Sequence, residues 1–339
     1  MKKFFLIALS VLLAGTLVLA DGVVKKTKTE IEFKKFGSFS SVQTELISGL
    51  KKAVESDNDF KGKGLMGKLA GKFALQSGRE GRILDLPEMT VTEINHKKKQ
   101  YTVQPIEAIS SEGTEDPSGA GGEEPAEEEE DSHIKIIRNE FTVDDTGENK
   151  TINGFDSRKF VITWIMEWEN TETGEKGTTR LLTDVWTTPM TGDIQQAREI
   201  EQQFNREHMQ RIGLNIPEME QEMLGTNWMS IFSQMGSQQT APEQDASRFM
   251  DEMKKIKGYP VIIDGKYFNE TEGGPQEEEA EQEGGIGGML GGLAKKALKK
   301  DKKEDDNQPA LAYYIELIEL KTNDIAENTF QPPADYKQK

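Results

Sequence analysis

Strict alternation of apolar and polar residues is the commonest pattern in this chain, and it predicts β-strands. The clearest example is 27–34, where Thr27, Thr29, Ile31 and Phe33 fall on one side. Successive residues of a strand point to opposite faces of a sheet, so this side would face the core. Similar runs predict about nine strands in hairpin-like succession, which favours an antiparallel sheet. The other predicted strands are 82–86, 90–95, 100–104, 134–143, 159–168, 177–187, 261–268 and 311–320.

The run 159–168 differs from the other predicted strands because it is apolar on both sides. Val161, Thr163 and Ile165 share one side. This pattern predicts a central strand that is covered on both faces, by helices on one side and by core or a ligand cavity on the other. The residues on its second side are Phe160, Ile162, Trp164, Met166 and Trp168.

Helical periodicity is confined to a segment at about 191–257, which we interpret as a helical insertion. Asp193 and Gln196 resemble a capping box at the start of one helix. A second helix is predicted from Thr240, with Glu243 three positions on and Gly258 at its end. Its apolar stripe consists of Ala246, Phe249, Met250, Met253 and Ile256.

Methionine and aromatic residues are concentrated between and beside these helices. Flexible thioether side chains suit a pliable apolar lining, although the same pattern is typical of an ordinary core between helices and a sheet. Both interpretations remain open from the sequence. The candidate residues for an apolar ligand cavity are Trp164, Met166, Trp168, Trp186, Phe204, Met223, Trp228 and Phe232.

The first twenty residues predict a cleaved signal peptide. Lys2 and Lys3 precede an apolar run, and small residues lead up to Ala20. The chain contains no cysteine, which excludes disulfides and attachment of a lipid to a cysteine. We therefore expect an exported protein, periplasmic or extracellular, that is soluble after cleavage and not lipid-anchored.

Negative charge is concentrated in two tracts rather than spread over the chain, whose formal net charge is −18. Residues 112–131 contain ten acidic residues, and residues 270–283 contain seven, with no Lys or Arg in either tract. Their composition predicts disordered insertions at about 110–132 and 270–308. A concentrated basic surface is not evident, so nucleic acid is not an expected partner.

Two Gly/Lys-rich segments have the spacing of basic amphipathic helices. In 61–74 the apolar residues recur every four positions, and 286–300 ends in a cluster of lysines. Each segment could lie on an anionic membrane surface, or form a flexible Gly-rich loop; the second could also pair with the adjacent acidic tract. The membrane-contact candidates are Leu65, Leu69, Phe73, Leu290, Leu293, Lys295 and Lys296.

Motifs for catalysis, metal ions or cofactors are not recognisable in the sequence. The three histidines, His96, His133 and His208, are scattered and form no metal-binding spacing. Serine hydrolase and phosphate-binding signatures are also lacking. We therefore expect a protein that is not an enzyme and needs no metal or cofactor.

An ordered set of short motifs resembles the LolA-like superfamily, which includes exported relatives of the periplasmic lipoprotein-sorting carrier. The resembling segments are 82–86, 89–101, 152–160, 183–186, 255–261 and 330–337. The resemblance implies an α+β fold in which a curved antiparallel half-barrel carries helices on its concave face. It also implies an apolar cavity for acyl chains and no catalytic residues.

Together these observations predict a signal peptide at 1–20 and a single domain at 21–339. The expected function is non-enzymatic binding of a lipid, an acylated partner or another apolar ligand in a hydrophobic cavity. The alternative is an envelope-surface or membrane-interacting structural protein that acts through its Gly/Lys segments. The sequence leaves the oligomeric state open.

Overall fold

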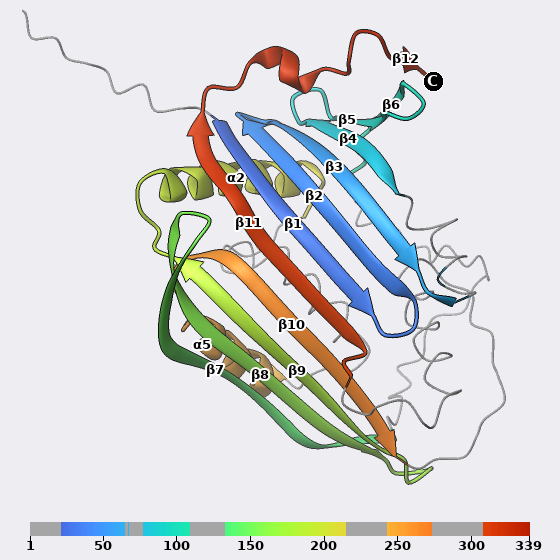
Figure 1. Ribbon diagram of the computed structural model, residues 1–339, viewed down its shortest axis with the longest axis vertical. Helices are drawn as coiled ribbons and strands as arrows, with labels where there is room; N and C mark the ends of the chain where they lie inside the picture. The colour runs from blue at the N-terminus through green and yellow to red at the C-terminus, as the bar shows by residue number, and fades with distance from the viewer. Residues whose placement is uncertain (1–21, 65–66, 68–76, 109–132, 215–242, 273–307) are drawn as a thin grey trace, which may run out of the picture.

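The computed structural model describes residues 22–64, 67, 77–108, 133–214, 243–272 and 308–339. Within these ranges one large antiparallel sheet dominates, and few helices accompany it (Figure 1). The helical elements are α2 (Asp193–Arg211), α5 (Glu243–Met253) and the short 3-10 helix η1 (Glu327–Phe330). The strands are β1 (Gly22–Phe33), β2 (Gly37–Ser48), β3 (Lys51–Gly62), β4 (Gly78–Asp85), β5 (Thr90–Asn95), β6 (Gln100–Pro105), β7 (Ile134–Ile152), β8 (Phe155–Asn170), β9 (Lys176–Thr188), β10 (Tyr259–Glu272), β11 (Leu311–Asn323) and β12 (Lys337–Gln338).

The strand order shows two meanders joined in the middle of the sheet. In the described residues the order is β12-β6-β5-β4-β3-β2-β1-β11-β10-β9-β8-β7, so the sheet is open and its edges are β12 and β7. Neighbouring strands are antiparallel except for the short parallel pair β12–β6. The pairing of β1 with β11 therefore connects the N-terminal meander to the C-terminal one.

Both long helices lie on one face of the sheet, which we call the inner face (Figure 1). The helix α2 packs across β1, β2 and β11, and α5 packs against β7. Ala197 and Phe204 of α2 join Val23 and Ile47 in one core cluster. Met253 of α5 belongs to a second cluster, formed with buried residues of β7 to β11. Burial of these apolar stripes is what holds the helices on the sheet.

The opposite, outer face carries the C-terminal residues. Phe330 is buried there against Ala53, Ile83 and Ile94, which alternate with the inward-facing residues of β3, β4 and β5. The Tyr336 hydroxyl lies 2.9 Å from Nδ1 of His96 and adds a polar contact to this cover.

A glycine makes room for the largest fully buried side chain of the described residues. Tyr313 lies directly opposite Gly265, and a Cβ at that position would meet the tyrosine ring at 2.0 Å. The ring therefore lies over the glycine backbone, and the Tyr313 hydroxyl reaches Thr183 at 2.9 Å. Burial raises the pKa of Tyr313 to about 12.

The predicted antiparallel sheet and all nine predicted strands are confirmed, but β2 and β3 were not predicted from the sequence. The start of α2 was predicted as a capping box, which is wrong. Asp193 is the first helical residue, the residue before it is Gly192, and no side chain caps the helix. The second predicted helix is present as α5, and the start predicted at Thr240 lies outside the described residues.

The prediction that 159–168 is a central strand covered on both faces is wrong. The strand β8 is next to the edge strand β7, and its inner face is the more buried one. Residues such as Val161 and Ile165 on its outer face are only half-buried. Their apolarity is explained by cross-strand packing on a partly exposed surface rather than by a second covering layer.

Several predicted segments lie outside the described residues. These are the signal peptide at 1–20, the acidic tract 112–131, most of the second acidic tract and nearly all of both Gly/Lys segments. Glu270 and Glu272 of the second tract belong to β10. Among the described helices, none is long and apolar enough to span a membrane.

Candidate functional site

Three of the predicted cavity residues lie together on the inner face of β8. Trp164 packs against the core cluster under α5, and its Nε1 donates a hydrogen bond to Asn139 Oδ1 at 2.8 Å. Met166 is buried. The ring of Trp168 lies over Gly177, where a Cβ would approach it to 2.3 Å. Trp164 and Met166 are packed as core, and none of the three side chains lines the inner pocket described below.

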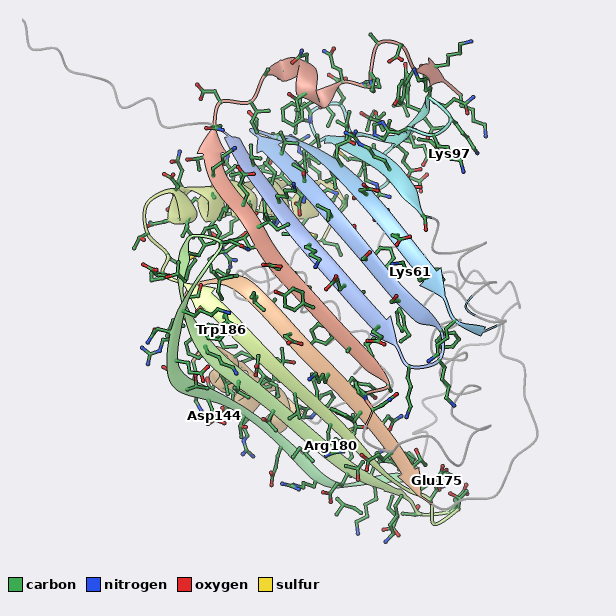
Figure 2. The ribbon with its side chains drawn as sticks, in the orientation of Figure 1. Lys61, Lys97, Asp144, Glu175, Arg180 and Trp186 are labelled. Carbon is green, nitrogen blue, oxygen red and sulfur yellow. The ribbon has the colours of Figure 1, made fainter. Side chains whose placement is uncertain are left out.

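The structure separates Trp186 from the other predicted cavity residues. Trp186 pairs with Lys159, and Trp164 pairs with Leu181, an odd number of positions away on β9. Trp186 therefore points to the outer face. The Lys159 ammonium lies 5.9 Å from the centre of its ring, and Figure 2 labels Trp186 on β9.

The remaining predicted residues divide between one pocket and the undescribed chain. Phe204 of α2 borders the larger pocket, although only 1% of the residue is exposed to solvent. The other cavity candidates, Met223, Trp228 and Phe232, lie outside the described residues. So do all the membrane-contact candidates: Leu65, Leu69, Phe73, Leu290, Leu293, Lys295 and Lys296.

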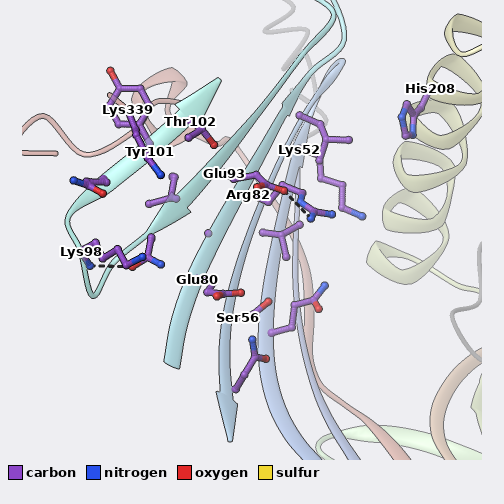
Figure 3. Close-up of a pocket in the computed structure, with 18 of the residues that line it drawn as sticks. Lys52, Ser56, Glu80, Arg82, Glu93, Lys98, Tyr101, Thr102, His208 and Lys339 are labelled. Carbon is purple, nitrogen blue, oxygen red and sulfur yellow. Dashed lines mark hydrogen bonds and ion pairs between the residues drawn. The ribbon is translucent and has the colours of Figure 1, made fainter. Parts of the chain in front are cut away.

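The larger pocket, which we call the inner pocket, lies between the C-terminal half of α2 and strands β2 to β6 (Figure 3). Its volume is about 650 Å³ and it is open to solvent. Pockets of about 300–1,000 Å³ are typical for small-molecule ligands. Phe204, Val54 and Leu84 supply apolar groups near α2.

Strand register places the polar residues of the inner pocket in rows across five strands. The first, which we call the polar row, runs through residues that face each other in successive strand pairs: Gln43, Ser56, Glu80, Asn95 and Gln100. The second, the charged row, lies two residues closer to α2 and consists of Glu45, Val54, Arg82, Glu93 and Thr102. The sheet therefore presents a regular polar floor opposite the helix.

Several charges beside the inner pocket have a partner of opposite sign. Arg82 lies 3.2 Å from Glu93, and Lys52 lies 2.5 Å from Glu45. His208 projects from α2 on the other side of the pocket from Lys52 (Figure 3). Burial, helped by the positive charge of Lys52, lowers the pKa of His208 below its ordinary value. The histidine is therefore mainly neutral at pH 7.

A buried ionic network lies directly beside the inner pocket and joins α2 to the sheet. Lys25 Nζ is 2.6 Å from Glu201 Oε1 and 3.5 Å from Glu45 Oε1. The Tyr259 hydroxyl donates to Glu201 at 3.0 Å, and Lys52 closes the network from the pocket side. Burial lowers the pKa of Lys25, but Tyr259, Glu201 and Glu45 raise it by more, so Lys25 stays charged. Two ammonium groups and two carboxylates thus balance one another.

The polar residues of β2 and β3 are the functional candidates that sequence reasoning missed. Gln43, Glu45 and Ser56 occupy positions that face inward, where apolar side chains would mark a strand. The alternation of apolar and polar residues that predicts a strand is therefore weak in both segments. A period of two among polar residues, Ser41, Gln43 and Glu45, is the signal that could have revealed them.

The inner pocket can hold a ligand through hydrogen bonds from its floor and through contacts with the apolar groups near α2. Within the described residues, no group of His, Asp and Glu is arranged to hold a metal ion. No known family model, curated protein or solved structure matches this chain.

Proposed function

We propose that this protein is a non-enzymatic binding protein that holds an amphiphilic, lipid-like ligand in the inner pocket. The observation that carries the proposal is the division of this pocket. Phe204, Val54 and Leu84 lie toward α2, and the polar row lies farther from the helix along the strands. An acyl chain would bury apolar area on the first side at about 25 cal/mol per Å². Its polar head would remain on the second.

The LolA-like resemblance belongs to this proposal, together with the α+β half-barrel and the export that it implies. An open antiparallel sheet with helices on one face is compatible with such a half-barrel. The described inner face supports a different placement of the ligand from the one predicted by the sequence, because Trp164 and Met166 are packed as core. The ligand would lie beside α2 rather than on β8.

Native mass spectrometry of residues 21–339 tests the proposal. The protein would be purified without detergent and incubated with a short-chain phospholipid and with a dodecyl detergent. We expect a stoichiometric adduct with at least one amphiphile. Ser56→Phe, which fills the pocket, should reduce adduct formation about tenfold, an effect worth ~1.4 kcal/mol. A protein that remains free of adducts with every amphiphile would overturn the proposal.

The matched control is Asp57→Phe. Asp57 is the next residue on β3, points to the outer face and is exposed. The Asp57→Phe variant introduces the same aromatic ring outside the pocket, so adduct formation should stay at the level of the unmodified protein. Equal loss in both variants would show that the aromatic ring disturbs the strand and would contradict a role for the pocket.

A further inference from the structure

The polar row offers an array of hydrogen-bonding groups with a fixed spacing. Its members lie on neighbouring strands in direct register. Adjacent strands of a sheet are about 4.8 Å apart, so the groups repeat at roughly that distance across the floor. This spacing is close to the width of one sugar ring, whose hydroxyl groups lie on opposite sides of the ring.

Much of the hydrogen-bonding capacity in this array is unused. Among the described residues, Ser56, Glu80 and Gln100 have no side-chain hydrogen-bond partner. Asn95 Oδ1 accepts a hydrogen bond from the backbone N–H of Lys98, and the side-chain NH2 group of Asn95 can still donate to a ligand. Asn205 adds a further amide from the α2 side. Amides, a hydroxyl and a carboxylate together supply donors and acceptors in one place.

The charges around the array are mixed in sign. Lys52 and Arg82 are paired with Glu45 and Glu93, and Lys98 and Lys339 also border the pocket. Glu80 stands in the middle of the polar row itself and would repel a phosphate or sulfate. A group that both donates and accepts hydrogen bonds, and carries no charge, fits this surface better.

We infer that the polar row binds a neutral, hydroxyl-rich group, namely a sugar ring or a short saccharide. The inference deepens the proposed function and rests on it where the saccharide is the head group of an amphiphile. The carboxylate of Glu80 and the amides of Asn95 and Gln100 accept from and donate to ring hydroxyls.

Binding of three dodecyl amphiphiles with different head groups tests the inference. Isothermal titration calorimetry would compare dodecyl maltoside, dodecylphosphocholine and dodecyl sulfate below their micelle concentrations. We expect dodecyl maltoside to bind about tenfold more tightly than the other two, as two additional hydrogen bonds would produce. Equal affinities for all three would overturn the inference and leave the proposed function standing.

Free maltohexaose distinguishes a glycolipid head group from a free saccharide. If maltohexaose binds and no amphiphile does, the inference holds and the proposed function fails. If only amphiphiles with a sugar head bind, both hold. If neither maltohexaose nor dodecyl maltoside binds, the inference is overturned; binding of the other amphiphiles then decides the proposed function separately.

A pair of variants on one strand locates the effect. Gln100→Leu removes an amide from the polar row, whereas Gln104→Leu removes one from an exposed position of β6 that does not line the pocket. We expect Gln100→Leu to weaken binding of dodecyl maltoside about tenfold and to leave dodecylphosphocholine unchanged. Gln104→Leu should change neither. An equal effect of both variants on dodecyl maltoside would overturn the assignment to the polar row.

Discussion

Lys25 on β1 and Glu201 on α2 form a buried ion pair, with 2.6 Å between Nζ and Oε1, across 176 positions of the chain. A helix that is held only by apolar contacts can slide or rotate on a sheet. Buried charges are costly to separate, so this pair favours one position of α2. The same helix supplies the inner pocket with Phe204 and His208.

Removing the charge of Glu201 should destabilise the protein strongly. In Glu201→Gln, Lys25 keeps only the 3.5 Å contact with Glu45. Breaking one side of a buried pair costs about 3 kcal/mol. Urea unfolding followed by circular dichroism would measure the free energy of unfolding.

The control for this variant lies on the same helix. Glu207 is 4.0 Å from Arg211 and is partly exposed, so Glu207→Gln should cost less than about 0.5 kcal/mol. A double replacement, Lys25→Met with Glu201→Leu, should recover much of the loss because no single charge is left unpaired. If Glu201→Gln is as stable as Glu207→Gln, the ionic network does not hold α2.

Acid should destabilise the protein through Glu45. Burial alone would raise the pKa of this carboxyl, but the ammonium groups of Lys25 and Lys52 lower it to about 2 from an ordinary value of 4.5. A lowered folded-state pKa gives stability that is present above the ordinary pKa and is lost as pH falls toward 2. The loss is about 3 kcal/mol, at ~1.4 kcal/mol per pKa unit.

Urea unfolding midpoints at several pH values between 5 and 2, the interval that the Glu45 pKa shift defines, would show this decline. Glu45→Gln should make the profile flatter over that interval. Glu107→Gln, at an exposed position on the strand-free segment after β6, should leave it as in the unmodified protein. Identical profiles for the unmodified protein and Glu45→Gln would contradict the role assigned to Glu45.

Adding one methyl group at Gly265 should disturb the core. The new Cβ in Gly265→Ala would lie 2.0 Å from the Tyr313 ring. The ring must move and lose its contact with Thr183. Overpacking of this kind costs about 1–3 kcal/mol, measurable as a lower urea midpoint together with a changed near-ultraviolet circular dichroism spectrum.

A double-mutant cycle separates this clash from a general effect of alanine. In a Tyr313→Leu background the ring is no longer present, so the same Gly265→Ala change should cost much less. Equal costs in both backgrounds would mean that the glycine is needed for another reason.

Truncation of Phe330 should release the C-terminal residues from the outer face. Phe330 is 6% exposed and packs against Ala53, Ile83 and Ile94. Phe330→Ala should cost about 3 kcal/mol. The variant should also increase the rate of amide hydrogen exchange in residues 324–339, while the exchange rates in β8 and β9 stay unchanged.

The control for Phe330 is a polar contact in the same segment. Asp335 pairs with Lys99, and both side chains are more than half exposed. Asp335→Asn should therefore cost less than about 0.5 kcal/mol. If it increases exchange as much as Phe330→Ala does, charge rather than apolar burial secures the segment.

The sequence predicts the strands well where apolar residues mark one face. Thr90–Asn95 agrees with β5 residue for residue, because the buried Thr92 and Ile94 alternate with less buried neighbours. Prediction from the sequence fails for β2 and β3, because their inward side chains form the ionic network and the polar row. Residues that build a polar pocket remove the hydrophobic signal by which a strand is recognised.

The candidate site was predictable only in part for a related reason. Phe204 was named as a cavity candidate, and helical spacing puts it on the face of α2 that meets the sheet, where it borders the inner pocket. Trp186 was named with Trp164 as a cavity candidate, but the two side chains lie on opposite faces of the sheet, because successive residues of a strand alternate in direction. Aromatic composition alone does not reveal that direction.

The pairing of β1 with β11 has a consequence for the order in which the chain can fold. Hairpins such as β1–β2 and β7–β8 join strands that are adjacent in the chain, so they close short loops and form early. Gly22 and Asn323, by contrast, meet across almost the full length of the chain. The two halves of the sheet can join only after β11 has been synthesised. Until then β1 is an unpaired edge of the first half, which makes it the strand most exposed to mispairing during biosynthesis.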